Sequence, residues 1–134
     1  MNKKEYHFSF DEYASIDELN SRDADLLKAA RAMTNNAYAP YSKFFVGAVA
    51  QLSNGKQIAG TNQENASYPV GLCAERALLA AAATQYPGIP IESMAISYRN
   101  TNKVGHYPLS PCGMCRQALQ EFEERTQHPV RLIL

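Results

Sequence analysis

The chain has 134 residues, 46% of them hydrophobic, and its 13 Lys and Arg side chains balance its 13 Asp and Glu side chains. This length and composition suit a single compact domain. Because there is no net positive charge, nothing favours binding to nucleic acid or to an anionic membrane surface. We therefore expect a small-molecule ligand or substrate.

The start of the chain is rich in acidic residues, and we expect residues 1–20 to form a solvated arm ahead of a domain that spans residues 21–134. The arm lacks the apolar core of a signal peptide, and no uncharged apolar stretch in the chain is long enough to span a bilayer. The three cysteines, two of them in a Cys-x-x-Cys pair, favour a reducing compartment over a disulfide framework. These features predict a cytoplasmic protein.

Apolar periodicity and turn residues predict helices that alternate with strands. The predicted helices are one that begins at Ser21 and ends at 38–41, one over 70–85 and one over 113–124. The predicted strands are 44–52, 57–62, 94–98 and 130–134, and the turn 53–56 joins the first two into a hairpin. Residues 99–109 form the one long predicted loop.

Strands separated by helices predict an α/β fold with parallel strand pairs, right-handed crossovers and helices on both faces of the sheet. The hairpin at residues 44–62 adds an antiparallel pair to this sheet. We therefore expect a mixed sheet between two helical layers.

All three cysteines lie in two short motifs, Cys-Ala-Glu-Arg at 73–76 and Pro-Cys-Gly-Met-Cys-Arg-Gln at 111–117. Three thiolates can hold a zinc ion on three sides and leave the fourth position for water. Both motifs are predicted at helix starts, where unpaired N–H groups and the helix dipole favour thiolates. We therefore predict that Cys73, Cys112 and Cys115 bind zinc in a hydrolytic metalloenzyme.

Glu75 follows Cys73 by two positions, which is about 200° around an ideal helix. It should therefore not bind the metal on the same side as Cys73, and it is free to act as a base. Its neighbours are mostly apolar, and a carboxylate among apolar residues needs a functional reason. Arg76 and Arg116 each adjoin a ligand, and we expect them to offset the negative charge of the thiolates by donating to sulfur. Gln117 is a further candidate for this surrounding shell.

Three other interpretations remain open from the residues alone. A structural zinc site would need a fourth protein ligand, for which only His7, His106 and His128 are available, none at a ligand spacing from a cysteine. The Cys-x-x-Cys pair suits a thioredoxin-like redox motif, but such motifs have no third cysteine and acid elsewhere. Finally, Glu75 is by itself compatible with a solvated helix charge.

Several segments together resemble the small, homotetrameric, three-cysteine cytidine deaminases of the zinc-dependent nucleoside deaminase superfamily. They are YAPYSKF at 38–44, GTNQENA at 60–66, CAER at 73–76 and SPCGMCRQ at 110–117. The cysteine motifs alone would fit several deaminases, but the Asn-x-Glu-Asn sequence at 62–65 narrows the resemblance to the nucleoside enzymes. The resemblance covers about residues 37–134 and implies a three-layer α-β-α sandwich.

This resemblance implies hydrolysis of cytidine and deoxycytidine to uridine and deoxyuridine plus ammonia, a reaction of pyrimidine salvage, with one zinc ion per chain. Glu75 would carry protons from water to N3 of the base and to the amine that leaves C4. The resemblance also implies a homotetramer.

Substrate contacts are implied by position. Asn62 and Glu64 resemble a clamp on the 3′-hydroxyl of the sugar, and Phe44 resembles an aromatic wall beside the base. The backbone around Ala66 and Ala74 would read the edge of the pyrimidine. Without the resemblance, a surface loop is the simpler reading for Asn62 and Glu64, and a core position for Phe44.

Two departures from the family pattern bear on the function. Family members commonly continue past the strand that matches 130–134, whereas this chain stops at Leu134, and the arm at 1–20 is longer than usual. We therefore expect the family's C-terminal segment to be absent. The alternatives are a related deaminase of the blasticidin type or with another cytosine-containing or guanidine-like substrate, and a zinc-stabilised binding protein without turnover. Asn62 and Glu64 argue against the first alternative, and Glu75 argues against the second.

Overall fold

The structure is a computed structural model that describes residues 1–101 and 107–134. Its helices are α1 (Ser21–Met33), α2 (Ala74–Gln85) and α3 (Gly113–Thr126), and its strands are β1 (Phe44–Leu52), β2 (Gln57–Thr61), β3 (Ile91–Asn100) and β4 (Arg131–Ile133). Short 3₁₀ turns occur at Ile16–Glu18, Thr34–Asn36 and Tyr68–Val70. Residues 102–106 of the predicted loop 99–109 lie outside the described residues, and residues 99–100 belong to β3.

The four strands form one mixed sheet in the order β2-β1-β3-β4. β1 is antiparallel to both β2 and β3, and β3 is parallel to β4. The connection through α2 therefore passes over β1 and joins two strands that run in the same direction, and α3 joins the parallel neighbours β3 and β4. This arrangement confirms the predicted α/β class with a mixed sheet that begins with a hairpin.

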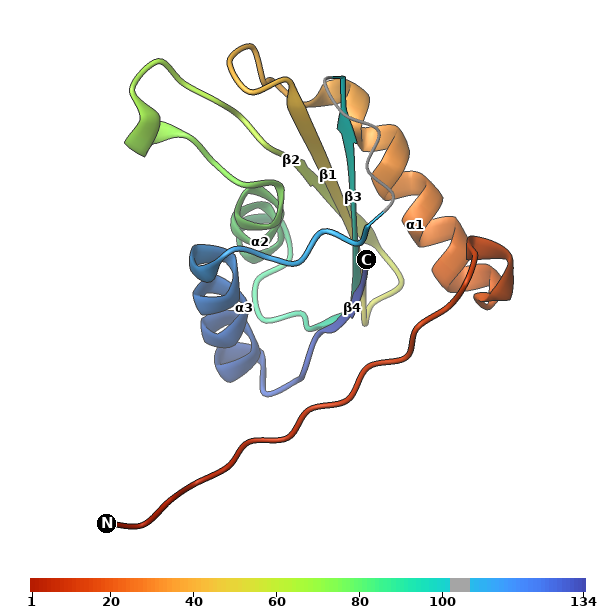
Figure 1. The fold of residues 1–134 in the computed structure, drawn as a ribbon, viewed down its shortest axis with the longest axis vertical. Coiled ribbons are helices and arrows are strands. Elements are labelled where there is room, and N and C mark those ends of the chain that lie inside the picture. The colour runs from red at the N-terminus through yellow and green to blue at the C-terminus, as the bar shows by residue number, and fades with distance from the viewer. Residues whose placement is uncertain (102–106) are drawn as a thin grey trace.

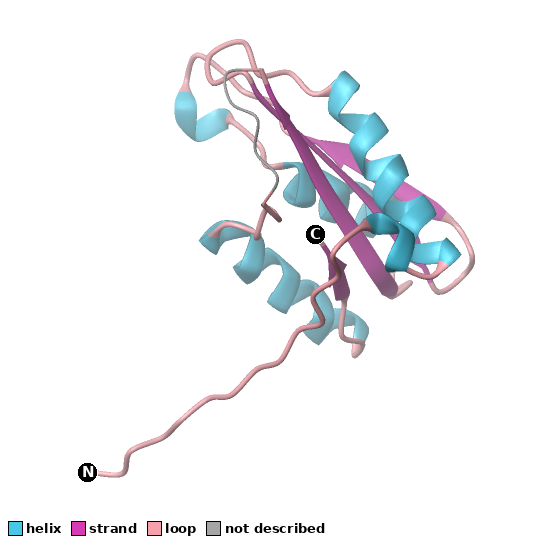
Figure 2. Ribbon diagram, turned by 45° about the vertical axis from the view of Figure 1, so that its right-hand side comes forward, coloured by secondary structure: helices cyan, strands magenta, loops and turns pink. Residues whose placement is uncertain are grey.

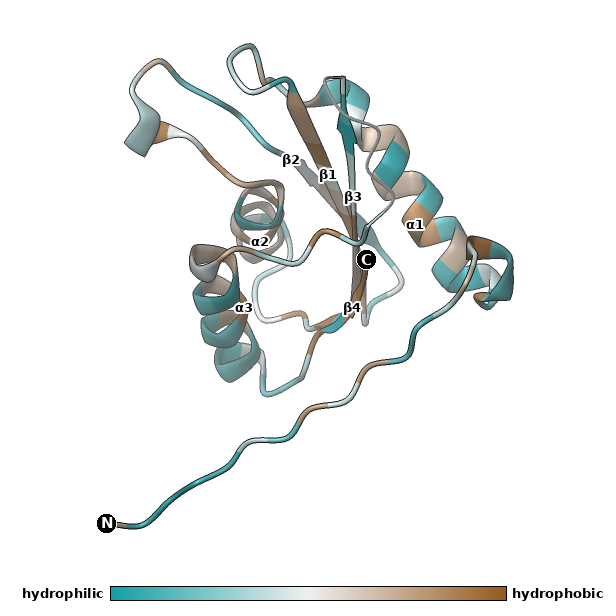
Figure 3. Ribbon diagram, in the orientation of Figure 1, coloured by the Kyte–Doolittle hydropathy of each residue, from teal (hydrophilic) through white to brown (hydrophobic). Residues whose placement is uncertain are grey.

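Helices cover both faces of the sheet, with α1 on one side and α2 and α3 on the other (Figures 1 and 2). The hydrophobic strands lie between these layers (Figure 3). The larger core fills the face under α2 and α3, and its largest fully buried apolar side chains are Leu52, Leu78, Ile91, Met94 and Ile96. A smaller core lies under α1 and consists of Leu26, Ala30, Val49, Ala95 and Ile133.

The start of α1 is joined to the edge of the sheet. The Asn20 side chain caps the helix, since its Oδ1 accepts a hydrogen bond of 3.0 Å from the Asp23 N–H. The Asp23 carboxylate in turn accepts two hydrogen bonds, of 2.8 and 2.6 Å, from the guanidinium of Arg131 on β4. The cap lies one residue before the predicted helix start at Ser21, and the ion pair joins the two ends of the domain.

Several boundaries differ from the prediction, and α1 ends at Met33 rather than at 38–41, with a 3₁₀ turn after it. α2 begins at Ala74 rather than at residue 70, because the backbone of Leu72 pairs with Gln63 and is therefore not available to a helix. β3 is longer than the predicted 94–98, since it pairs along the whole length of β1. Residues 1–13 have no regular secondary structure, and their side chains are exposed. No helix in the described ranges is long and apolar enough to cross a membrane.

Candidate metal centre

Two helix starts bring the three thiols together. Cys73 and Cys112 are the N-cap residues of α2 and α3, and Cys115 lies in the first turn of α3. The Sγ atoms of Cys73 and Cys112 are 3.8 Å apart, and those of Cys112 and Cys115 are 3.4 Å apart. All three sulfurs lie within 4.8 Å of one another. The predicted cluster is therefore present, formed by segments that are far apart in the sequence.

The spacing of the sulfurs fits a tetrahedral zinc ion. Zinc–sulfur bonds of about 2.3 Å at tetrahedral angles put two sulfurs about 3.8 Å apart. The observed separations of 3.8 and 3.4 Å are close to this value and far longer than a disulfide bond of about 2.05 Å. All three cysteines are free thiols. The three-sulfur donor set can therefore hold zinc and leave one position for another ligand.

The pKa values of the three thiols differ because their environments differ. Burial raises the pKa of Cys115 well above its usual range, and it also raises the pKa of Cys73. Burial acts in the same direction on Cys112, but the backbone N–H of Cys115 and its thiol outweigh it and lower the pKa of Cys112. Cys112 is therefore the thiol that ionises most readily at these helix starts.

Glu75 lies beside the three sulfurs without joining them as a ligand. It is the second residue of α2 and is only 5% exposed, and the group of three possible metal ligands contains no carboxylate. Burial is the largest cause of the raised pKa values of Cys73 and Cys115, and the negative charge of Glu75 adds to it. The carboxylate is therefore within electrostatic reach of both thiols. The positive end of the helix dipole favours a negative charge at this position.

The histidines considered as a fourth ligand do not join the cluster in the described part of the chain. His7 lies on the exposed arm, and His128 follows α3 with a buried Nδ1 that has no hydrogen-bond partner. Neither belongs to the group that could hold a metal ion. His106 lies outside the described residues. The geometry among the described residues thus favours an open three-sulfur site over a closed structural one.

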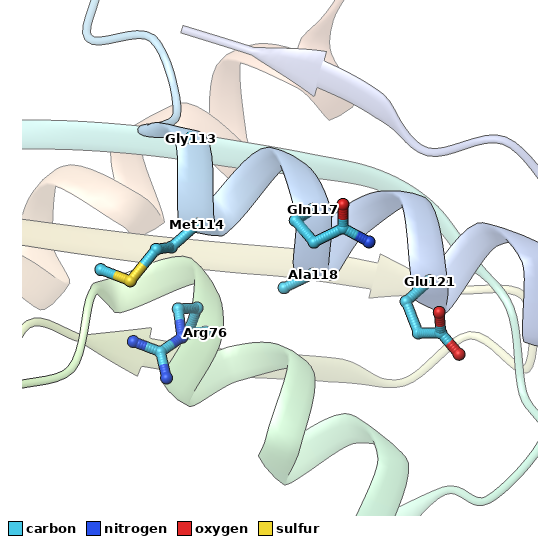
Figure 4. Close-up of a pocket in the computed structure, with 6 residues that line it drawn as sticks. All are labelled: Arg76, Gly113, Met114, Gln117, Ala118 and Glu121. Carbon is cyan, nitrogen blue, oxygen red and sulfur yellow. The ribbon is translucent and has the colours of Figure 1, made fainter.

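The predicted surrounding shell comes from the two helices that hold the sulfurs. Arg76 on α2 lines a hollow together with Met114, Gln117 and Glu121 on α3 (Figure 4). Arg116 is exposed on the same helix. Among the described residues, no hydrogen bond joins the guanidinium of Arg76 or Arg116 to a sulfur. The proposed support of the thiolates by these groups stays a prediction.

The Asn62 side chain bonds to the backbone of β1. Its Nδ2 donates to the carbonyl oxygen of Phe44 at 2.8 Å, and its Oδ1 accepts from the Val46 N–H at 2.7 Å. These two bonds use one of the two N–H groups on Nδ2 and one of the two lone pairs on Oδ1, so one of each remains for a further bond. Asn62 therefore holds the residue that resembles the aromatic wall, and it keeps some capacity to bind a ligand.

Glu64 contacts the loop that precedes β1. One carboxylate oxygen accepts from the backbone N–H groups of Tyr41 and Ser42 at 2.9 and 3.3 Å. Burial of this carboxyl opposes ionisation, but the hydrogen bonds from Ser42 and Tyr41 outweigh it and lower the pKa of Glu64. The carboxylate is therefore held as an anion beside the loop that precedes β1.

The remaining predicted substrate residues lie in different settings. Phe44 is half-buried and stacks on Tyr98 of β3, with ring centroids 5.0 Å apart. Ala74 is buried at the start of α2, whereas Ala66 is exposed in the loop after β2. Tyr98 was not predicted as part of the site, because only the pairing of β3 with β1 brings it to Phe44.

A family model for the cytidine and deoxycytidylate deaminase zinc-binding region matches residues 20–128. A protein named cytidine deaminase from Mycoplasma pneumoniae is 40% identical over 96 residues, which span 71% of this chain and 68% of that protein. A cytidine deaminase from Mycobacterium tuberculosis is also 40% identical, over 99 residues that span 71% of this chain and 69% of that protein.

Solved structures agree with these sequence matches. The cytidine deaminase of Burkholderia pseudomallei superimposes with a TM-score of 0.65 at 40% identity, covering 78% of this chain and 77% of that one. The cytidine deaminase of Mycobacterium tuberculosis gives a TM-score of 0.66 at 32% identity, covering 82% of each chain. A cyanophage dCMP deaminase at 15% identity and a TM-score of 0.52 shares the fold alone.

Proposed function

The chain belongs to the cytidine and deoxycytidylate deaminase family, and we propose that it hydrolyses cytidine and deoxycytidine to uridine and deoxyuridine with release of ammonia. This reaction is a step of pyrimidine salvage. The observation that carries the proposal is the cluster of Cys73, Cys112 and Cys115 beside the buried carboxylate of Glu75. A thiol cluster alone would suit a structural site, but a buried acid next to it suits proton transfer.

Zinc bound by the three sulfurs would supply a Lewis acid that activates water for attack on C4 of the cytosine ring. Glu75 takes one proton from that water and delivers it to N3, and it then moves the second proton of that water, from the hydroxyl on C4, to the amine that leaves C4. Its burial excludes bulk water from this path, and the start of α2 stabilises its negative charge. The chemistry balances as cytidine plus water giving uridine plus ammonia.

The sugar and the base would be held by residues near β1. We infer that Asn62 and the carboxylate of Glu64 bind the 3′-hydroxyl, because both lie on the short segment after β2 and both are anchored by hydrogen bonds. Phe44, supported by Tyr98, would pack against the cytosine ring. The backbone of Ala66 and Ala74 would meet the polar edge of the base.

A homotetramer belongs to the same proposal. Exposed apolar side chains lie on the loops that flank residues 62–64 and Cys73, namely Tyr38, Tyr41, Tyr68, Val70 and Leu72. We expect contacts with other copies of the chain to bury such a surface.

The boundary between arm and domain at residue 20 is supported by the family match from residue 20 and by the start of α1 at Ser21. Three free thiols suit the reducing cytoplasm, where we place the protein.

The proposal is tested by incubating zinc-loaded protein with cytidine and following the ultraviolet absorbance change on conversion to uridine. Deoxycytidine should be converted as well, with release of one ammonia per nucleoside. Cytosine, cytidine monophosphate, guanine and blasticidin are tested beside the two nucleosides. Turnover of blasticidin or a nucleotide without turnover of cytidine would overturn the assignment.

A further inference from the structure

Gly60 on β2 lies directly against the first turn of α2. A Cβ atom at this position would lie 2.4 Å from the carbonyl oxygen of Ala74 and 2.6 Å from the backbone nitrogen of Leu78. Ala74 and Leu78 are four residues apart, the spacing at which a C=O and an N–H bond within an α-helix. The atoms that a side chain would strike are backbone atoms, so rotation of a side chain cannot relieve the overlap.

The turn that rests on Gly60 carries the chemistry of the site. Ala74 lies between the candidate zinc ligand Cys73 and the candidate acid Glu75, and its carbonyl belongs to the peptide that continues into Glu75. Glu75 is 5% exposed and Ala74 is fully buried, so both residues are packed against their neighbours. Any displacement of Ala74 therefore moves Glu75 relative to the sulfurs of Cys112 and Cys115, which come from α3.

We propose that Gly60 is a positioning residue of the deaminase site, a role that rests on the proposed function. By having no side chain, it lets β2 support the first turn of α2 at backbone contact and so sets the distance between the carboxylate of Glu75 and the three sulfurs. Residue 60 itself touches neither substrate nor metal in this role. A displacement near 1 Å at a reacting group can cost about a hundredfold in rate.

The chain contains a matched control on the opposite face of the sheet. A Cβ atom at Gly47 on β1 would lie 2.3 Å from the carbonyl oxygen of Ala30 and 2.9 Å from the backbone nitrogen of Thr34. Gly47 therefore supports α1 as closely as Gly60 supports α2, and neither glycine has a positive φ. Alanine at either position strains helix packing to a similar degree, but only Gly60 faces the helix that carries Glu75.

The test compares Gly60→Ala with Gly47→Ala in the full zinc-loaded chain. Unfolding in urea measures the stability of each variant, transfer of zinc to a chelating dye measures how firmly the ion is held, and kcat for cytidine is taken per folded molecule. We expect both variants to lose stability. Only Gly60→Ala should release zinc faster, by about tenfold or more, and only it should lose kcat, by about ten- to a hundredfold.

Wild-type zinc release and kcat in folded Gly60→Ala, or equal losses in Gly47→Ala, would overturn the positioning role. If Gly60→Ala does not fold, the comparison is repeated in the cold with an osmolyte that favours the folded state. If Gly60→Ala does not fold even under these conditions while Gly47→Ala folds, Gly60 is needed for folding of the whole domain, and this result would also overturn the positioning role. If wild-type protein does not act on cytidine, the proposed function fails, while the zinc-release comparison still decides the role of Gly60.

Discussion

Gln63 and Leu72 pair through two reciprocal backbone hydrogen bonds, of 2.9 and 3.0 Å, in a single antiparallel bridge. Gln63 lies between the two candidate sugar-binding residues, Asn62 and Glu64, and Leu72 immediately precedes Cys73. The bridge therefore joins the segment proposed to hold the ribose to the segment that provides one zinc ligand. We expect these two parts of the site to keep their relative positions when substrate binds.

The first prediction concerns metal content. Purified protein should contain about one zinc ion per chain, because three sulfurs at tetrahedral spacing come from the starts of α2 and α3. Cys73→Ser and Cys115→Ser should each lower the zinc content well below one. Both should also lower the melting temperature, since binding free energy that joins the two helices is lost. Elemental analysis and thermal unfolding provide the measurements.

Met114→Ala is the matched control for these variants. Met114 lies between Cys112 and Cys115 but is exposed, and it provides none of the three sulfurs of the cluster. Its zinc content should stay near that of the wild type. Protein that is folded and free of zinc after purification without chelators would contradict the metal assignment.

The second prediction concerns the proton carrier. Glu75→Gln keeps the size of the side chain but cannot accept and deliver a proton, so kcat should fall by about 10²- to 10⁴-fold while zinc content stays near one. Glu121→Gln, an exposed position on α3, should leave kcat unchanged. The measurement is steady-state turnover of cytidine beside elemental analysis. Near wild-type turnover in Glu75→Gln would place the proton carrier elsewhere.

The third prediction concerns the sugar contact. Glu64→Ala should lower kcat/KM for cytidine and deoxycytidine by about tenfold or more, because a charge-assisted hydrogen bond to the 3′-hydroxyl contributes about 1.5–3 kcal/mol. A 3′-deoxy analogue lacks that hydroxyl, so its kcat/KM should barely change. Steady-state kinetics on the three substrates checks this pattern.

A structural effect of Glu64 can be separated from the sugar contact. Glu64 also accepts from the N–H groups of Tyr41 and Ser42, and Glu64→Gln keeps an oxygen for these groups. This variant should unfold like the wild type while it still loses part of the preference for the 3′-hydroxyl. An equal fall on all three substrates in Glu64→Ala would make Glu64 a loop-stabilising residue only.

Local signals in the sequence were sufficient to predict the elements whose conformation depends on residues nearby in the chain. The turn at Ser53–Lys56 is an example, since Asn54 and Gly55 favour a tight hairpin and Gly55 has a φ of 81°. The thiol cluster was also predictable, because three cysteines at two helix starts leave few other arrangements. The residues alone could not show that β3 pairs antiparallel with β1, which depends on contacts between residues about 40 to 55 positions apart in the chain.

The same limit applies within the site. Asn62 was predicted as a sugar ligand or, without the resemblance, as part of a surface loop, but its amide also links the backbone at Phe44 and Val46. The pairing of β1 with β2 brings these groups together. The predicted α2 extended too far toward the N-terminus, because helix propensity carries no information about the bridge between Gln63 and Leu72. Long-range backbone pairing, rather than local preference, accounts for both differences.

The last prediction concerns stability against acid. The hydrogen bonds from Arg131 hold the pKa of Asp23 below its usual range. A carboxyl with a lowered pKa in the folded state contributes stability above its unfolded pKa of about 3.9, and this contribution is lost as the pH falls further. Asp23 is 5% exposed and Arg131 is 57% exposed, so the pair is intermediate between a surface and a buried ion pair. We expect Arg131→Met to cost about 1–3 kcal/mol near neutral pH.

Urea unfolding near neutral pH and at successively lower pH values below about 4, through the lowered pKa of folded Asp23, checks this prediction. The gap in unfolding free energy between wild type and Arg131→Met should narrow in acid, because protonated Asp23 no longer gains from the guanidinium. Arg125→Met is the control, since Arg125 is exposed, lies over the ring of Phe122 and forms no ion pair among the described residues. Loss of zinc in acid affects all three proteins alike, so it does not change the comparison. A gap that is the same at both pH values would show that Arg131 stabilises the domain through packing of its side chain and not through the charge of Asp23.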